Sequence, residues 1–170
     1  MRAWIDKCAY LSRRGRRWLE STAPNEVKRI LVIRQCAFGD YMAARPFLVE
    51  LRRLFPEAHI TLATVTTYRY AVPEDLVDEV FVQETRGRLA EQWRSLRAIE
   101  PVDILFDLAD TSRSRVLTLM APAAIKLGFP YRGVFNHLLY DVGLRRSNYH
   151  YEAEVLLDFL KVMGHKPRYP

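Results

Sequence analysis

The chain has 170 residues, of which 49% are hydrophobic and 12% are aromatic. That length fits one ordinary domain, and the composition excludes an intrinsically disordered chain. No apolar run approaches the roughly 18 residues needed to cross a membrane, and two cysteines are too few for a disulfide framework. The start, MRAWIDKCAY, lacks the apolar core and the cleavage site of a secretory signal. We therefore expect a cytoplasmic protein.

The positive charge is concentrated at the N-terminus. Residues 1–29 hold eight basic and three acidic side chains, so they carry five of the six net positive charges, whereas the remaining residues are nearly neutral. This distribution argues against a nucleic-acid surface spread over the whole domain. Within residues 1–20, the apolar side chains, Trp4 and Trp18 among them, recur near helical spacing around four arginines. The segment is a helix on an anionic membrane surface, a helix packed on a neighbouring domain, or a solvated extension.

Strand and helix patterns alternate over residues 28–164, after an extension and linker at 1–27. Strands are predicted at 29–33, 59–64, 79–83, 103–108 and 124–129. Helical patterns lie at 44–55, 89–99, 116–120 and 150–163, with a turn or short helix at 73–78 and a long loop at 129–148. Because of Pro46, the first helix should begin near Ala43 or bend at the proline. Parallel strands need crossover helices, so the order predicts an α/β fold with a Rossmann-like, doubly wound, mainly parallel sheet.

The first strand runs into a tight loop, QCAFGD, that ends in Gly39 and Asp40 where a helix begins. A glycine lets a ligand approach the backbone, and a helix N-terminus favours negative groups. Asp40 is accordingly a helix cap, a catalytic base, or both. Cys36 in the same loop is a nucleophile or, as we favour, a small half-buried filler. The loop lacks the glycine spacing of a dinucleotide site and the Gly-Lys-Ser/Thr ending of a P-loop.

Two more sets of residues have the chemistry to bind an anion. The stretch 107–115, DLADTSRSR, follows a predicted central strand, where Arg113 and Ser114 either hold an anion or belong to a capping loop with surface arginines. The second set consists of cations in loops after strands, which bind an anion or are ordinary solvated charge: Arg69, Arg132, Arg145 and Arg146. The four scattered histidines and two distant cysteines show no zinc spacing, so no metal is expected.

The ordered pattern over residues 28–164 resembles the N-terminal half of the glycosyltransferase family 9 enzymes, the ADP-heptose:lipopolysaccharide heptosyltransferases. The resemblance is carried by KRILVIRQCAFGDYMAARPFLVELRRLFPEAHITLAT, DEVFV, DILFDLADTSRSR, KLGF and HYEAEVLLDFLKVMG. It implies the N-terminal half of a GT-B fold, with an inverting transfer that needs no metal or other cofactor. The acceptor would be held mainly by this half and an ADP-heptose-like donor by a second domain. Residues 165–170 then read as the start of a linker to that missing domain.

The resemblance also assigns roles to single residues. Asp40 matches the position proposed as general base, which would deprotonate an acceptor sugar hydroxyl. Basic side chains would face the acidic inner-core sugars or lipid phosphates of lipopolysaccharide. The implied substrate contacts are Gly39, Arg69, Arg113, Ser114 and Arg132. Where the family often has Gln-Gly, this chain has Ala109 and Asp110, so we expect an extra negative charge beside the acceptor.

Two rival functions remain open. The first is a non-catalytic module that binds an anionic glycolipid or a partner protein at the inner membrane through Trp4, Trp18 and the arginines. The second is an unrelated Rossmann-like nucleotide binder. Under the glycosyltransferase hypothesis, the chain by itself should be inactive, because a GT-B reaction centre lies between two domains. It would work in the cytoplasm and lie on the inner membrane if its basic segment binds there.

Overall fold

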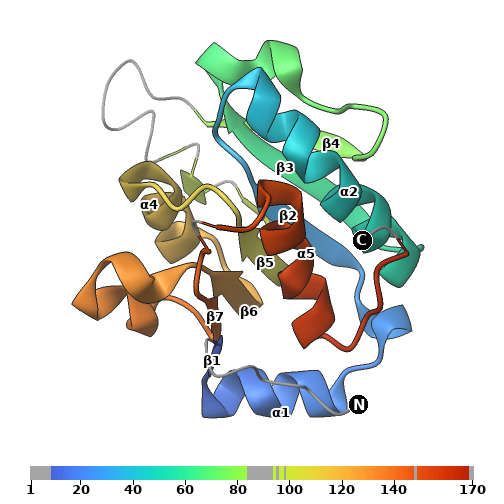
Figure 1. The fold of residues 1–170 in the computed structure, drawn as a ribbon, viewed down its shortest axis with the longest axis vertical. Helices are drawn as coiled ribbons and strands as arrows, with labels where there is room; N and C mark the ends of the chain where they lie inside the picture. The colour runs from blue at the N-terminus through green and yellow to red at the C-terminus, as the bar shows by residue number, and fades with distance from the viewer. Residues whose placement is uncertain (1–8, 84–93, 95, 98, 148, 169–170) are drawn as a thin grey trace.

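The computed structural model describes residues 9–83, 94, 96–97, 99–147 and 149–168, with the backbone alone at 132 and 134. Its centre is a seven-stranded sheet of order β1-β7-β6-β5-β2-β3-β4 (Figure 1). The neighbouring strands pair in parallel, except that β1 is antiparallel to β7. The strands are β1 (Ala9–Leu11), β2 (Arg29–Ile33), β3 (His59–Val65), β4 (Glu79–Gln83), β5 (Val102–Asp107), β6 (Ala123–Gly128) and β7 (Val142–Leu144). The predicted α/β fold with a mainly parallel sheet is confirmed.

The five strands predicted from the sequence are β2 to β6. Side chains alternate across a strand, so a central strand that is apolar throughout supplies both faces of the sheet. In β2, Ile30 and Val32 join the larger hydrophobic cluster, whereas Leu31 and Ile33 join the smaller one. All four are at most 1% exposed, which places β2 at the centre of the domain.

Helices α2 (Phe38–Leu54) and α5 (Glu152–Val162) cover one face of the sheet, and α4 (Ser112–Met120) lies on the other (Figure 1). The expected start near Ala43 is wrong, because α2 begins at Phe38 and continues through Pro46. Phe47 and Leu48, directly after the proline, are fully buried, and this packing offsets the hydrogen bond that proline cannot donate. The predicted helix over 89–99 falls mainly outside the described residues.

The N-terminal segment differs from the expected amphipathic helix over residues 1–20. Ala9–Leu11 forms the edge strand β1, and helix α1 (Arg13–Ser21) follows, capped by the Ser12 hydroxyl, which accepts a hydrogen bond from the Gly15 amide at 2.9 Å. A Cβ on Gly15 would lie 2.8 Å from the Asp141 carbonyl oxygen, so α1 lies directly against the chain before β7. Residues 9–21 are thus packed onto the sheet. Trp4 lies outside the described residues.

Trp18, one of the two tryptophans of the suggested membrane contact, packs in part against the domain. Its side chain is partly buried against the larger hydrophobic cluster, beside Phe55 and Met163. No helix within the described part of the chain is long and apolar enough to cross a membrane.

Two further segments carry more structure than the sequence indicated. The predicted loop at 129–148 contains the 3-10 helices η3 (Pro130–Arg132) and η4 (Val134–Leu138) and the strand β7. After α5, the chain turns at Gly164, which has a φ of 83°, and then lies against α2. There the buried carboxylate of Glu50 bonds the His165 ring at 2.6 Å and the Arg168 amide at 3.1 Å.

Candidate functional site

The strand order reverses between β2 and β5. From β2 the chain moves to β3 and β4 on one side, and from β5 it moves to β6 and β7 on the other. Open α/β sheets bind their ligands at the carboxyl ends of the strands beside such a switch point. Here the two strand ends are joined by a hydrogen bond from the Leu108 amide to the Ile33 carbonyl, at 3.0 Å. The loop that follows β2 therefore lies where a ligand site is expected.

Asp40 is placed at this switch point, in the first turn of α2. Ala37 is the N-cap residue and makes no side-chain cap, so the interpretation of Asp40 as the helix cap is wrong. The Asp40 side chain is 47% exposed, and its Oδ1 lies 3.5 Å from Nη2 of Arg34. A carboxylate that is both accessible and held beside a cation is suited to accept a proton from a bound hydroxyl group.

Gly39 leaves open space in front of this loop. A Cβ built on Gly39 would meet no atom within 4 Å, so internal packing does not require glycine here. The residue is exposed at the start of a helix whose first amides have no side-chain cap. A helix N-terminus of this kind favours a polar or negatively charged ligand beside it.

Arg34 holds the site together and was not singled out from the sequence. Its guanidinium group is buried and donates to the Leu108 carbonyl oxygen at 2.5 Å and to Glu152 Oε1 at 3.1 Å. Arg146 in turn donates to both oxygens of Glu152 at 2.8 Å. Asp40, Arg34, Glu152 and Arg146 thus form a balanced chain of two acids and two bases that links β2, β5, α2 and α5. Such charges can be buried only when they are paired.

Asp107, at the end of β5, makes its hydrogen bonds within the domain. It is fully buried, and its carboxylate accepts hydrogen bonds from the hydroxyls of Tyr140 at 2.7 Å, Ser114 at 3.0 Å and Thr118 at 3.3 Å. The backbone amides of Ala109 and Asp110 also donate to it, at 3.1 and 3.3 Å. Burial raises the pKa of the Asp107 carboxyl group, although the hydrogen bonds oppose this shift. This cluster anchors the loop after β5.

Ser114 belongs to that internal cluster. It is fully buried, and with Thr111 it forms a capping box in which each side chain accepts a hydrogen bond from the other's amide at 3.0 Å. The Ser114 hydroxyl is therefore committed within the domain, as the capping-loop interpretation predicts. Arg113, one residue earlier, is exposed in the first turn of α4.

Asp110 does not bring the expected negative charge to the acceptor side. Its carboxylate is 1% exposed and pairs with Nη2 of Arg115 at 2.7 Å. The backbone has a φ of 51°, in the left-handed region that aspartate tolerates better than most residues. The charge is buried and balanced, so the departure from the family pattern at this position leaves the surface unaffected.

The other predicted contacts lie at the same edge but not against Asp40. Arg69 is in the 3-10 helix η2 (Thr66–Ala71) after β3, with its guanidinium group 3.9 Å from the carboxylate of Glu74. Arg132 ends η3 after β6, and only its backbone is described. Because β2, β3, β5 and β6 are parallel, the loops with Asp40, Arg69, Arg113 and Arg132 all leave one edge of the sheet. Among the described side chains, Arg34 is the cation within ion-pair range of Asp40.

The structure also bears on the role of Cys36 and on metal binding. Burial raises the pKa of the Cys36 thiol to about 12, against the opposing effect of Arg34. The thiol is therefore protonated at neutral pH, as the filler interpretation predicts and a nucleophile would not be. Within the described ranges, no group of three histidine, cysteine or acidic side chains is placed to hold a metal ion.

Comparison of the fold with solved structures finds heptosyltransferases. The Escherichia coli heptosyltransferase WaaC with ADP has a TM-score of 0.69 at 16% identity, covering 84% of this chain and 49% of that one. WaaC with ADP-2-deoxy-2-fluoro heptose has a TM-score of 0.65 at 16% identity, covering 84% and 50%. A glycosyl transferase family 9 structure from Veillonella parvula has a TM-score of 0.59 at 26% identity, covering 82% and 42%. No family model and no curated protein sequence matches the chain.

These matches confirm the resemblance to glycosyltransferase family 9 at the level of the fold. The chain spans about half the length of the solved structures that it matches. Its seven-stranded sheet therefore corresponds to one half of a GT-B enzyme.

Proposed function

We propose that this chain is the acceptor-binding half of an inverting glycosyltransferase related to the ADP-heptose:lipopolysaccharide heptosyltransferases. One observation carries the proposal: a half-exposed carboxylate, Asp40, stands at the switch point of a sheet that has the fold of half a heptosyltransferase. A second half with the same general architecture would supply the donor site. The solved relatives that carry ADP or an ADP-sugar analogue are about twice as long as this chain.

Asp40 acts as the general base in this proposal. Its carboxylate takes the proton from an acceptor hydroxyl while that oxygen forms a bond to the anomeric carbon of the donor sugar. The bond from that carbon to the ADP leaving group breaks, and the configuration at the carbon inverts. Arg34 keeps the Asp40 side chain at the switch point, and Glu152 and Arg146 keep Arg34 in place. Removing a positioned base of this kind lowers the rate by about 10²–10⁴-fold.

The acceptor is an anionic glycan, of which the lipopolysaccharide inner core is the example that the family resemblance suggests. Arg69 in η2 and Arg113 in the first turn of α4 are exposed at the same edge as Asp40, and guanidinium groups recognise carboxylates and phosphates well. Gly39 leaves space for the acceptor at the start of α2. The enzyme would then work at the cytoplasmic side of the inner membrane, where such an acceptor is held.

The test is transfer activity of this chain combined with a donor half encoded beside it or taken from a relative. The Asp40→Asn variant should lose about 10²–10⁴-fold in the transfer rate, with little change in acceptor binding. Asp158→Asn is the matched control, because Asp158 is a half-exposed aspartate on α5 that pairs with Lys161 at the surface.

Full activity of the Asp40→Asn variant would remove the assignment of the base. Absence of transfer in every combination, together with retained binding of an anionic glycolipid, would favour the non-catalytic module instead.

A further inference from the structure

Large apolar side chains protrude from the surface formed by α4 and η4. Leu119 on α4 is 68% exposed, and Phe135 and Leu138 on η4 are 80% and 86% exposed. Together with Val116 and Leu139 they line an open depression of about 290 Å³. We call these five residues the α4–η4 patch. A group of exposed apolar residues of this size marks an interaction surface more often than isolated exposed residues do.

The segments that carry and adjoin the α4–η4 patch are rich in basic residues. The two stretches of sequence that build this side of the domain, 9–19 and 111–148, contain ten basic residues and a single acid, Asp141. Asp141 is turned inward, where its carboxylate bonds the Ser12 hydroxyl and the Lys126 amide, each at 3.1 Å. Arg115 and Arg146 pair with acids from other segments. Arg14 lies 4.0 Å from Asp141, and the Lys126 ammonium group donates to the Thr118 carbonyl oxygen. Among the described side chains of the two stretches, the exposed arginines are Arg13, Arg14, Arg16, Arg17, Arg113 and Arg145.

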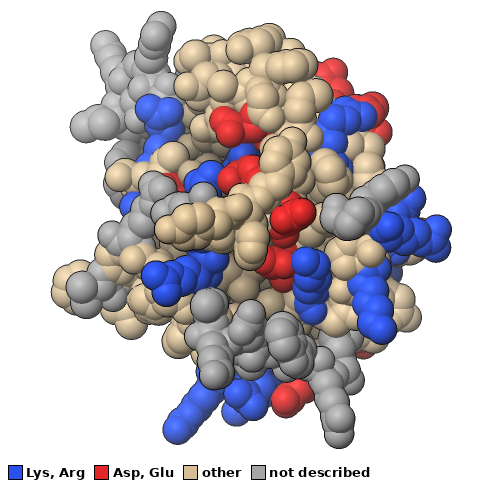
Figure 2. Space-filling view, viewed as in Figure 1, with Lys and Arg blue, Asp and Glu red and all other residues tan. Residues whose placement is uncertain are grey.

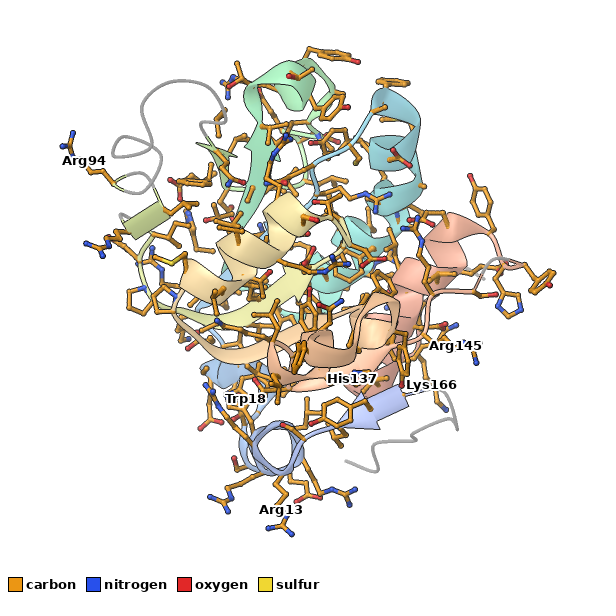
Figure 3. The ribbon with its side chains drawn as sticks, turned by 90° about the vertical axis from the view of Figure 1, so that its left-hand side faces the viewer. Arg13, Trp18, Arg94, His137, Arg145 and Lys166 are labelled. Atoms are coloured by element: carbon orange, nitrogen blue, oxygen red, sulfur yellow. The ribbon has the colours of Figure 1, made fainter. Side chains whose placement is uncertain are left out.

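The basic helix α1 and the apolar η4 are joined through aromatic contacts. The ring of His137 in η4 packs edge-on against Tyr10 in β1, at 5.4 Å between centroids, and against Tyr131 in η3, at 5.0 Å. β1 continues directly into α1, where Arg13, Arg14, Arg16 and Arg17 are exposed. Figure 3 shows η4 with His137 facing the viewer and α1 with Arg13 below it. The face over α2 and α5, turned by 90° from this view, mixes both charge signs (Figure 2).

We propose that the α4–η4 patch, with the arginines of α1, docks this protein on an anionic lipid bilayer. Protruding Leu and Phe side chains bordered by arginines are the composition that binds the boundary between lipid headgroups and acyl chains. A nucleic acid would match the charge but not the apolar side chains at the centre of the surface. This differs from the sequence-based hypothesis, because the apolar side chains of the contact lie far along the chain, whereas Trp18 is partly buried against the larger hydrophobic cluster.

The test uses the full chain and vesicles of phosphatidylglycerol mixed with phosphatidylcholine, compared with vesicles of phosphatidylcholine alone. We expect saturable binding to the anionic vesicles that weakens with salt. The double variant Phe135→Ser, Leu138→Ser should bind about 10–100-fold more weakly. Tyr70→Ser is the matched control, because Tyr70 on η2 is 76% exposed but lies outside the patch. Both sites are at the surface, so circular dichroism should show unchanged folding.

Four results would overturn the proposal. The first two are vesicle binding that the double variant retains and vesicle binding that Tyr70→Ser loses equally. The third is oligomerisation of the wild type that the double variant abolishes without any change at vesicles, which would make a second copy of the chain the occupant. Binding to RNA that tolerates the double variant, without vesicle binding, would also contradict a lipid partner. The measurement needs no transferase activity, so it can fail while the proposed function stands.

Discussion

The loops that follow β2 and β5 start side by side at the centre of the sheet, yet they use their carboxylates in opposite ways. After β5, Asp107 is fully buried and accepts hydrogen bonds from three hydroxyls and two amides of the same domain. After β2, Asp40 is half exposed, with Arg34 as its ion-pair partner at 3.5 Å. The first carboxylate is used to build the fold, whereas the second remains accessible to a ligand. Position at a strand end alone therefore does not identify a catalytic carboxylate. The two carboxylates are distinguished by the hydrogen bonds that each already accepts within the domain.

The largest expected effect is on stability at Asp107. Asp107→Ala removes the shared acceptor of five donors, most of them buried, so the free energy of unfolding should fall by roughly 3–5 kcal/mol. Asp40→Asn should change it by less than about 0.5 kcal/mol, because that side chain is half exposed. Urea unfolding of the two variants measures both values. Equal losses would mean that Asp40 is also a structural residue.

A second pair of variants compares the glycines of the two regions. A Cβ on Gly128, at the end of β6, would lie 2.2 Å from the Tyr140 ring, whose hydroxyl is fixed by Asp107. Gly128→Ala should lower the free energy of unfolding by about 1–3 kcal/mol through overpacking. Thermal unfolding checks this value. An unchanged melting temperature would show that the Tyr140 ring can move and that the cluster around Asp107 is less rigid than its hydrogen bonds indicate.

The pH dependence of stability provides a third comparison. Because burial raises the pKa of Asp107 in the folded state, its protonation stabilises the fold at low pH, and this contribution is lost as the pH rises through the folded-state pKa. The amide of Asp107→Asn has no such titration. The wild type should therefore lose stability relative to Asp107→Asn as the pH rises above about 4, the ordinary range of an aspartate carboxyl group. Unfolding curves at several pH values measure the difference in the free energy of unfolding between the two proteins. If the wild type instead gains stability relative to Asp107→Asn as the pH rises, the pKa of Asp107 is lowered by folding, not raised.

A small effect on stability, of opposite sign to that at Gly128, is expected at Gly39. A Cβ there meets no neighbour within 4 Å, so Gly39→Ala should change the free energy of unfolding by no more than about 1 kcal/mol, in the stabilising direction. Acceptor binding should nevertheless weaken, because the new methyl group occupies the space in front of α2. Calorimetric titration with an anionic glycan, alongside urea unfolding, separates the two effects. Unchanged glycan affinity would place the acceptor elsewhere.

The central sheet was predictable because its strands are continuous apolar runs separated by helical patterns. β1 and β7 were missed, since each has three residues and their pairing joins Ala9 to Leu144, a contact that no local pattern reveals. Because this pairing was missed, the sequence indicated an N-terminal extension outside the domain, although β1 belongs to the sheet. The predicted start of α2 was wrong because the prediction rested on Pro46. Burial of the residues on both sides of the proline outweighs the loss of its backbone hydrogen bond.

The candidate site was predictable in part. Asp40 was singled out because it follows a buried strand in a loop with a glycine. Arg34 and Glu152 were missed, although an arginine directly after the apolar run of β2 is a signal of a buried, paired charge. Ser114 was assigned to a ligand, and its commitment to Asp107 depends on the fold of the loop, which the sequence pattern does not determine.

The central claim is that the edge of the sheet beside Asp40 holds an anionic acceptor. Its most direct test is a nuclear magnetic resonance titration of the isotope-labelled chain with a carboxylate-bearing inner-core oligosaccharide of lipopolysaccharide. We predict saturable shifts of the amides of residues 37–41 and around Arg69 and Arg113, while the amides of α1 and of the described tail at 165–168 stay unchanged. Shifts confined to α1 or to the α4–η4 patch, with none at residues 37–41, would contradict the account.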